Sequence, residues 1–154
     1  MTKTILIASD HGGFALKESL KPYLENKGFD VRDLGAFSEE SCDYPEFAYC
    51  LASKIGKGKF KRGILICKSG IGNSIVANRV PGARAALCVN EKCARLSRAH
   101  NDSNILVLGS FFVSVNQAKK ITDIWLKTKF EGGRHKRRLN QIKEIERKIR
   151  GGLK

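Results

Sequence analysis

Five short apolar runs, separated by segments long enough to be helices, constrain the fold of this chain more than any other feature. The runs are rich in Ile, Leu and Val, as buried parallel strands are: TILIAS, FDVRDL, RGILIC, RAALCV and NILVLG. The segments of helical length are residues 14–27, 44–56, 72–79, 91–99 and 114–128. This alternation implies right-handed crossovers with helices on both faces of one sheet. We therefore predict an α/β fold with three layers, α/β/α, around a five-stranded parallel sheet.

The C-terminal segment RHKRRLNQIKEIERKIRGG predicts one more helix. Leu139, Ile142, Ile145 and Ile149 recur at near-helical spacing with charged residues between them, which is typical of an amphipathic helix. We expect this helix to cover a neighbour, in the same subunit or in another. No repeat, low-complexity tract or linker rich in Pro or Ser divides the sequence. Residues 1–154 are therefore expected to form a single domain.

The apolar runs and the cysteines indicate the compartment. No apolar run approaches the roughly 20 residues needed to cross a bilayer, and MTKTILIASDHGG turns polar too early for a signal peptide. The five cysteines include no CxxC pair, which favours free thiols in a reducing compartment over a disulfide framework or a zinc site. We expect a cytoplasmic protein without membrane contact.

The strongly basic charge suits an anionic partner. The chain has 29 basic and 15 acidic residues, a net charge of +14, and residues 130–154 hold nine Lys or Arg against three Glu. Nucleic acid and a phosphorylated small molecule are both candidates, and a solvated basic surface is the third interpretation. The basic tail lacks interleaved aromatic residues, a helix-turn-helix pattern and an RNP-like pattern, which disfavours nucleic acid.

Chemically active residues lie next to three of the predicted strands. Ser9–Gly13 follow the first strand, Cys67–Gly72 follow the third, and His100–Asp102 precede the fifth. Ligands of open α/β sheets bind beyond the carboxyl ends of the strands. We therefore expect a carboxylate, two imidazoles, a thiol and a hydroxyl to converge at that edge.

The loop at Cys67 fits none of three familiar glycine or cysteine motifs. A dinucleotide fingerprint needs glycine at Ile75, a P-loop needs Gly-Lys-Ser/Thr, and a cysteine phosphatase loop needs Arg at Asn73. The remaining pattern is a thiol at a strand end, followed by a turn and a helix N-terminus. That setting is expected to lower the thiol pKa from about 8.5 and to stabilise an anion on a substrate. Four other cysteines are expected to be buried and inert: Cys42, Cys50, Cys88 and Cys93.

Five motifs, spread in order over nearly the whole chain, resemble the ribose-5-phosphate isomerase B family, which includes the subunits of galactose-6-phosphate isomerase. The motifs are SDHGG, DYPEFA, GILICKSGIGNSIVANR, LSRAHNDSNILVLG and FEGGRHKRR. The resemblance implies a Rossmann-like fold and an aldose–ketose isomerase that uses no metal or organic cofactor. It also implies a homodimer or homotetramer whose active sites are shared between two subunits.

The resemblance further implies roles for particular residues in isomerising a small sugar phosphate. Cys67 is the general base, His100 drives ring opening, and the turn after Cys67 forms an anion hole with the Ser69 hydroxyl. The substrate-binding residues are Asp10, His11, Lys68, Ser69, Gly70, Ile71, Gly72, Asn101, Arg134 and Arg138. Arg134 and Arg138 would hold the phosphate from one helix face.

Three positions depart from the family pattern. Members without the cysteine use a glutamate six positions later, where this chain has Asn73, so the chain is of the cysteine type. Lys68 replaces a small residue, and it either lowers the thiol pKa or points to solvent. Phe111 stands where many members carry a phosphate-touching arginine. We predict ribose 5-phosphate as substrate, in the pentose phosphate part of carbohydrate metabolism, with allose 6-phosphate, galactose 6-phosphate or a tetrose phosphate as alternatives.

Overall fold

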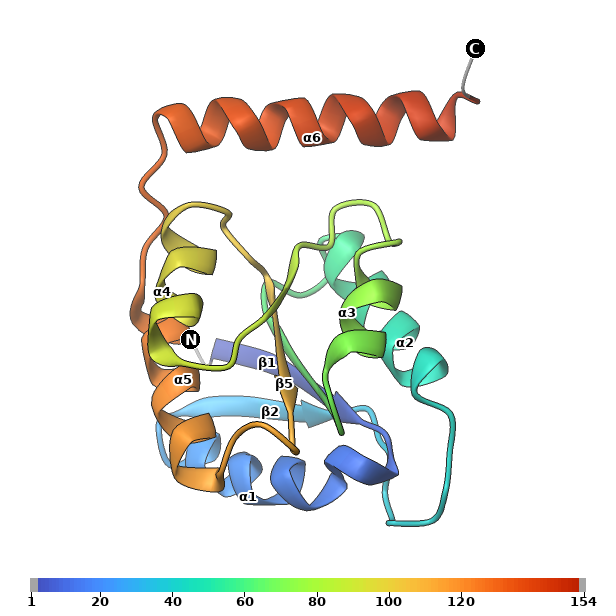
Figure 1. The fold of residues 1–154 in the computed structure, drawn as a ribbon, viewed down its shortest axis with the longest axis vertical. Helices are drawn as coiled ribbons and strands as arrows, with labels where there is room; N and C mark the ends of the chain where they lie inside the picture. The colour runs from blue at the N-terminus through green and yellow to red at the C-terminus, as the bar shows by residue number, and fades with distance from the viewer. Residues whose placement is uncertain (1–2, 153–154) are drawn as a thin grey trace.

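A parallel five-stranded sheet forms the centre of the computed structural model, which describes residues 3–152 (Figure 1). Every neighbouring pair of strands is parallel, in the order β2-β1-β3-β5-β4. The strands are β1 (Lys3–Ser9), β2 (Phe29–Asp33), β3 (Gly63–Cys67), β4 (Ala85–Leu87) and β5 (Ile105–Gly109). Each falls within or next to a predicted apolar run, so the predicted sheet is confirmed.

The helices alternate with the strands along the chain. A short 3₁₀ turn, η1 (His11–Gly13), precedes the first of them. The helices are α1 (Phe14–Glu25), α2 (Tyr44–Gly56), α3 (Ile71–Ala77), α4 (Glu91–Ala99), α5 (Val115–Lys127) and α6 (Arg134–Arg150). Clear caps explain two of the starts, because the Asn90 side chain accepts the Cys93 N–H and Ser114 forms a capping box with Gln117.

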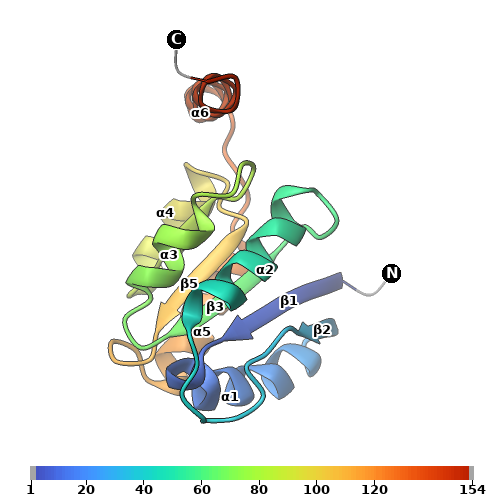
Figure 2. The same ribbon diagram turned by 90° about the vertical axis from the view of Figure 1, so that its right-hand side faces the viewer.

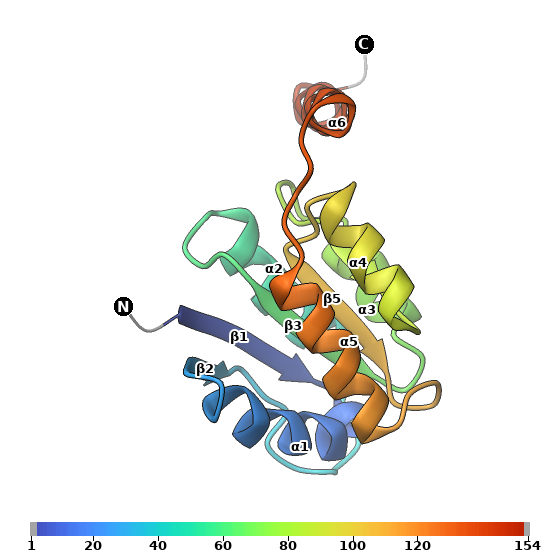
Figure 3. The same cartoon turned by 90° about the vertical axis from the view of Figure 1, so that its left-hand side faces the viewer.

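The period-two alternation of the strands builds two separate cores. On β1, Ile5 and Ile7 pack with α1, α4 and α5, whereas Leu6 and Ala8 pack with α2 and α3. Figures 2 and 3 show these two helix layers from opposite sides of the sheet. The three-layer α/β/α, Rossmann-like architecture is therefore confirmed.

The strand order reverses between β1 and β3. In the sheet, β2 lies beside β1 on one side, and β5 and then β4 lie beside β3 on the other. Such a reversal of strand order opens a gap between the loops that leave the two central strands, which is where open α/β sheets bind ligands. Those loops hold Asp10–Gly13 and Cys67–Gly72.

Helix α6 lies apart from the three layers, across the end of the molecule at which β5 begins (Figure 1). Its predicted apolar stripe is largely uncovered, since Ile142, Ile145 and Ile149 are all exposed. Glu146 tethers the helix to the body by accepting the Gly82 N–H at 3.1 Å. Within residues 3–152, no helix is long and apolar enough to cross a membrane.

Candidate active site

The loops after β1 and β3 are in close contact at the carboxyl edge of the sheet. The Asp10 N–H donates to the Ile66 carbonyl at 3.3 Å. Gly13 allows this approach, because a Cβ at that position would lie 2.4 Å from the Ile66 oxygen. The fold therefore brings the predicted residues of the first and third strand ends together.

Cys67 ends β3 with its thiol largely enclosed, only 5% of the residue being exposed. The Gly70 N–H donates to its Sγ at 3.1 Å. Gly70 has φ +77°, and a Cβ there would lie 2.5 Å from Leu87, so the turn needs glycine at this point. The Ser69 Oγ accepts the Ile71 N–H at 3.2 Å. The turn from Ser69 to Gly72 thus wraps the sulfur with backbone donors, as an anion hole requires.

The expectation that this junction lowers the thiol pKa is wrong for the single chain. Burial raises the pKa of Cys67, and the nearby Asp10 carboxylate raises it further. Hydrogen bonds from the backbone N–H groups of Gly70, Asn73 and Ser69 act in the opposite direction without overcoming burial. Lys68 is not among the groups that lower the pKa of this thiol. The sequence indicates the backbone N–H donors of the turn but not how deeply the Cys67 thiol is buried.

Asp10 and His11 lie at the same edge as predicted. Asp10 is buried and its Oδ1 accepts the Gly13 N–H at 3.0 Å. His11 packs against the loop before α2, with its Nδ1 at 3.2 Å from the Cys42 nitrogen. Both side chains are therefore held in place by backbone groups next to the Cys67 turn.

The Lys68 side chain extends from the Cys67 turn toward Gly12 and Phe111. Its Cγ lies 2.4 Å from where a Cβ of Gly12 would be, so its stem lies against that glycine. Its Nζ is 5.9 Å from the centre of the Phe111 ring. The side chain is exposed and has no ion-pair partner among the described residues. The sequence left two orientations open for Lys68, beside the thiol or toward solvent, and the structure has the one toward solvent.

The second set of predicted residues lies at the opposite edge of the sheet. Cys67 pairs with Gly109 at the carboxyl ends of β3 and β5, whereas Gly63 pairs with Ile105 at their amino ends. His100 and Asn101 precede Ile105, so at least the length of a strand, about 13 Å, separates them from Cys67. The prediction that they converge with Cys67 in one chain is therefore wrong. Helix α4 runs back along the sheet and carries its C-terminal residues to the amino edge.

Arg134 and Arg138 lie at this amino edge too, on the first turns of α6. The segment before α6 is fixed there because the Glu131 N–H donates to the Ala99 carbonyl at 3.0 Å. Both arginines are exposed, and the ion pairs within residues 3–152 include neither of them. Their guanidinium groups are free to bind an anion.

His100 forms a compact group with Glu131 and His135, two residues that the sequence analysis did not single out. The two imidazole rings stack with centroids 4.2 Å apart and planes 9° apart. Glu131 Oε2 lies 3.8 Å from His100 Nε2 and 3.6 Å from His135 Nε2. Burial, then His100 and Arg134, lower the pKa of His135 from its usual value, while Glu131 opposes that shift. The i,i+4 spacing of Glu131 and His135 was the available sequence signal.

These three side chains are also the candidate metal-binding group of the described residues. Their ligand atoms lie within 4.8 Å of one another, which is near the spacing around zinc. However, an imidazole directs its lone pair within the ring plane. Two nearly parallel rings therefore cannot both point at one ion unless they turn, and we assign no metal to this group.

Asn73 is a further residue whose side chain the sequence analysis left without a role. It is buried on the first turn of α3, and neither its Oδ1 nor its Nδ2 has a hydrogen-bond partner within residues 3–152. A buried amide left unpaired costs about 1–3 kcal/mol. The backbone N–H of the same residue lowers the pKa of the Cys67 thiol.

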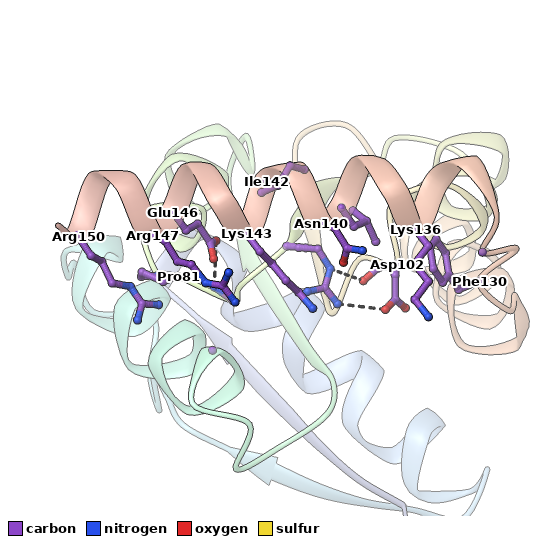
Figure 4. Close-up of a pocket in the computed structure, with 15 residues that line it drawn as sticks. Pro81, Asp102, Phe130, Lys136, Asn140, Ile142, Lys143, Glu146, Arg147 and Arg150 are labelled. Atoms are coloured by element: carbon purple, nitrogen blue, oxygen red, sulfur yellow. Dashed lines mark hydrogen bonds and ion pairs between the residues drawn. The ribbon is translucent and has the colours of Figure 1, made fainter. Parts of the chain in front are cut away.

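A groove of about 660 Å³ lies beneath α6, bounded by the loop at Pro81 and by Asp102 and Phe130 (Figure 4). Arg84 borders it and is held by Asp102, its Nε donating to the carbonyl and its guanidinium pairing with the carboxylate at 3.1 Å. None of the predicted site residues lines this groove. The sequence-derived site and this groove are therefore different places.

The other cysteines differ in their surroundings. Cys88 is buried, and burial raises its pKa to about 11. Cys42 and Cys93 are partly buried, and Cys50 is exposed on α2. The prediction of a buried, inert thiol is thus confirmed for Cys88 and wrong for Cys50, which lies on the solvent side of its helix.

Comparisons with known proteins agree along nearly the full length of the chain. A family model described as Ribose/Galactose Isomerase matches residues 5–142. Ribose-5-phosphate isomerase B of Escherichia coli K12 is 43% identical over 95% of this chain and 98% of its own. A probable ribose-5-phosphate isomerase B of Mycoplasma genitalium is 46% identical over 96% and 98%.

Solved structures give the same result. The Clostridium thermocellum ribose-5-phosphate isomerase B superposes with a TM-score of 0.93 at 49% identity, covering 95% of this chain and 99% of that one. The Mycoplasma genitalium enzyme with bound ribulose-5-phosphate has a TM-score of 0.90 at 45% identity, covering 94% and 96%. With its fold, its motifs and its full-length relatives in agreement, this chain belongs to the ribose/galactose isomerase family.

Proposed function

We propose that this protein is an aldose–ketose isomerase that interconverts ribose 5-phosphate and ribulose 5-phosphate through an enediolate, with Cys67 as general base. One arrangement carries the proposal: a largely enclosed thiol where the strand order reverses between β1 and β3, with an N–H of a glycine turn directed at its sulfur. The named relatives and the ribulose-5-phosphate bound to the Mycoplasma enzyme support it. The reaction needs no organic cofactor, because a base and an anion hole suffice for proton transfer next to a carbonyl.

The chemistry assigns successive steps to the two edges. His100 opens the sugar ring and so exposes the C1 aldehyde. The Cys67 thiolate then removes the proton from C2, and negative charge develops on the carbonyl oxygen. The N–H groups of the Ser69–Gly72 turn and the Ser69 hydroxyl stabilise that charge. The C2 hydroxyl proton passes to the C1 oxygen, and return of the abstracted proton to C1 then gives the ketose. Removing one such donor commonly costs about 100- to 1000-fold in rate.

We further propose that each complete site takes its two halves from two chains of a cytoplasmic homodimer. The strand-long separation of Cys67 from His100 prevents one sugar phosphate from touching both within one chain. Exposed Ile71 and Ile75 on α3, beside the Cys67 turn, provide an apolar surface for a second copy. The exposed stripe of α6 provides another. Free thiols such as Cys50 suit a reducing compartment.

The phosphate is proposed to lie between cations of both chains. Arg134 and Arg138 approach from one chain with free guanidinium groups, while Lys68 approaches from the Cys67 side of the other. Lys68 supplies a charge close to Phe111, where many relatives carry an arginine. Asp10, His11 and Asn101 are proposed to hold the sugar hydroxyls, which carry donors and acceptors for all three side chains.

The decisive experiment is turnover of a panel of aldose phosphates by purified protein. Ribose 5-phosphate, allose 6-phosphate, galactose 6-phosphate and erythrose 4-phosphate should be assayed side by side, with Cys67→Ala as the blank. We expect the highest kcat/KM for ribose 5-phosphate. A clear preference for a different sugar would assign the Lys68 and Phe111 pair to that substrate, and no turnover of any of them would refute the proposal.

A further inference from the structure

We infer that Glu131 and His135 are positioning residues that hold the His100 imidazole in the orientation needed for ring opening. This inference rests on the proposed function, in which His100 acts on the sugar ring. Neither residue is required to touch the substrate. Each acts through its contact with His100.

The contacts between the three side chains are specific. Stacking at 4.2 Å with a 9° angle between planes fixes the plane of the His100 ring. Glu131 places one carboxylate oxygen between the two Nε2 atoms, at 3.8 Å and 3.6 Å. The hydrogen bond from the Glu131 N–H to the Ala99 carbonyl, at 3.0 Å, keeps this carboxylate next to the end of α4.

His135 is the exception on its helix. Within α6 it is the single residue classed as buried, at 7% exposure, while the apolar Ile142, Ile145 and Ile149 remain exposed. A helix that buries an imidazole in preference to its isoleucines is not ordered here by hydrophobic packing. What the burial achieves is the stack on His100.

Ring opening explains why such an arrangement is useful. The reaction removes the proton from the C1 hydroxyl, breaks the bond between C1 and the ring oxygen, and returns a proton to that oxygen as the aldehyde forms. An imidazole can carry this proton only if one nitrogen faces the sugar in the correct tautomer. The Glu131 carboxylate oxygen is 3.8 Å from Nε2, beyond hydrogen-bond distance, so it acts on this nitrogen through its charge. A negative charge on that side favours the proton on Nε2 and leaves Nδ1 as the acceptor, as a third group orients a catalytic histidine.

The test separates ring opening from enolisation. Ribulose 5-phosphate is acyclic, so exchange of its C1 proton with deuterated solvent requires Cys67 but no ring opening. We would measure ribose 5-phosphate turnover and this exchange for His135→Ala, Glu131→Gln and His100→Ala. Glu144→Gln on the exposed face of α6 serves as the matched control. Circular dichroism and sedimentation would establish that each variant is folded and assembled as wild type is.

We expect His135→Ala and Glu131→Gln to lose at least about tenfold in kcat for ribose 5-phosphate with little change in KM, following the larger loss in His100→Ala. Exchange into ribulose 5-phosphate should stay within about twofold of wild type. Glu144→Gln should match wild type in both assays.

Three results would contradict this inference. Parallel loss of exchange would show that the two residues support the site as a whole. A raised KM at unchanged kcat would make His135 a phosphate ligand. If both variants turned over ribose 5-phosphate normally while His100→Ala did not, His100 would not depend on Glu131 or His135 for its orientation. Full ribose 5-phosphate turnover by His100→Ala would instead overturn the ring-opening role in the proposed function.

Discussion

The two edges of the sheet show two different ways of preparing groups for catalysis. At the carboxyl edge, backbone atoms hold the site: Cys67 is enclosed by a glycine turn, and Asp10 caps the turn after β1. At the amino edge, side chains on α4 and α6 meet one another, and Arg134 and Arg138 remain exposed and unpaired. The first region is largely buried, and the second is cationic and exposed. A buried base and an exposed phosphate clamp are suited to meet across a subunit boundary.

Of the changes at the two edges, removal of the Cys67 thiol is expected to lower activity most. Cys67→Ala should lower kcat by 100-fold or more, in the range of about 100- to 10,000-fold for a general base, while KM stays near that of wild type. Steady-state assays and substrate titration measure the two quantities, and the exposed Cys50→Ala is the control. Retention of more than about a tenth of wild-type kcat would assign the proton transfer to another residue.

Mixing of two inactive variants tests directly whether the edges belong to different chains. Cys67→Ala and His100→Ala homodimers should each be nearly inactive. After denaturation and joint refolding, half of the dimers are mixed, and each mixed dimer has one intact site. Activity should recover to about a quarter of wild type. If the two edges served one chain, no recovery would occur.

Arg134 and Arg138 should affect binding more than chemistry. Each forms charge-assisted hydrogen bonds worth about 1.5–3 kcal/mol, so substitution by alanine should raise KM about tenfold or more, with a smaller effect on kcat. Lys136→Ala and Arg137→Ala, on other faces of the same turns, are the matched controls. Damage in Lys136→Ala with a normal Arg138→Ala would place the phosphate elsewhere on α6.

Lys68 should give a smaller change in the same direction. Because its ammonium group is exposed and is a single flexible point charge, Lys68→Met should raise KM by about three- to tenfold. Phe111→Arg in that background should restore binding if the two positions serve one phosphate. Phe112→Arg, at the neighbouring exposed phenylalanine, is the control, and equal rescue by both arginines would indicate a general charge effect.

The smallest effect concerns pH. A raised pKa means that the Cys67 thiolate, the form that alkylates, appears only above the ordinary cysteine range. Iodoacetamide labelling of Cys67, followed by mass spectrometry, should therefore have a midpoint above about 8.5. Asp10→Asn should lower that midpoint, since the carboxylate raises the pKa. A midpoint below the ordinary value would mean that cations from a second chain outweigh burial.

The fold could be predicted from the sequence because local and global signals agree. Runs such as RGILIC and NILVLG alternate with helical segments along the sequence. Within a strand such as β1, alternate residues belong to the two different cores. Helix α2, residues 44–56, was predicted to the residue. Its DYPEFA start combines an acidic residue with proline at the first turn, a clear helix signal.

The site could be predicted only in part. Motifs identify Cys67 and His100 as site residues. Their separation depends on the direction of the strands: Cys67 ends a strand at the carboxyl edge, whereas His100 lies in the segment before a strand, at the amino edge. The shifted pKa of Cys67 depends on burial, which its neighbours in sequence do not reveal. The stack of His100 on His135 joins two helices and has no local pattern.

The contact of Lys68 with Gly12 has a consequence for how this protein can diverge. The lysine stem occupies the space that a side chain at position 12 would need, with its Cγ 2.4 Å from where a Cβ would lie. Positions 12 and 68 are therefore expected to covary among descendants of this sequence. A side chain at position 12 requires the lysine to take another rotamer or position 68 to carry a smaller residue. Change at position 12 is thus coupled to the conformation and size of the residue at 68.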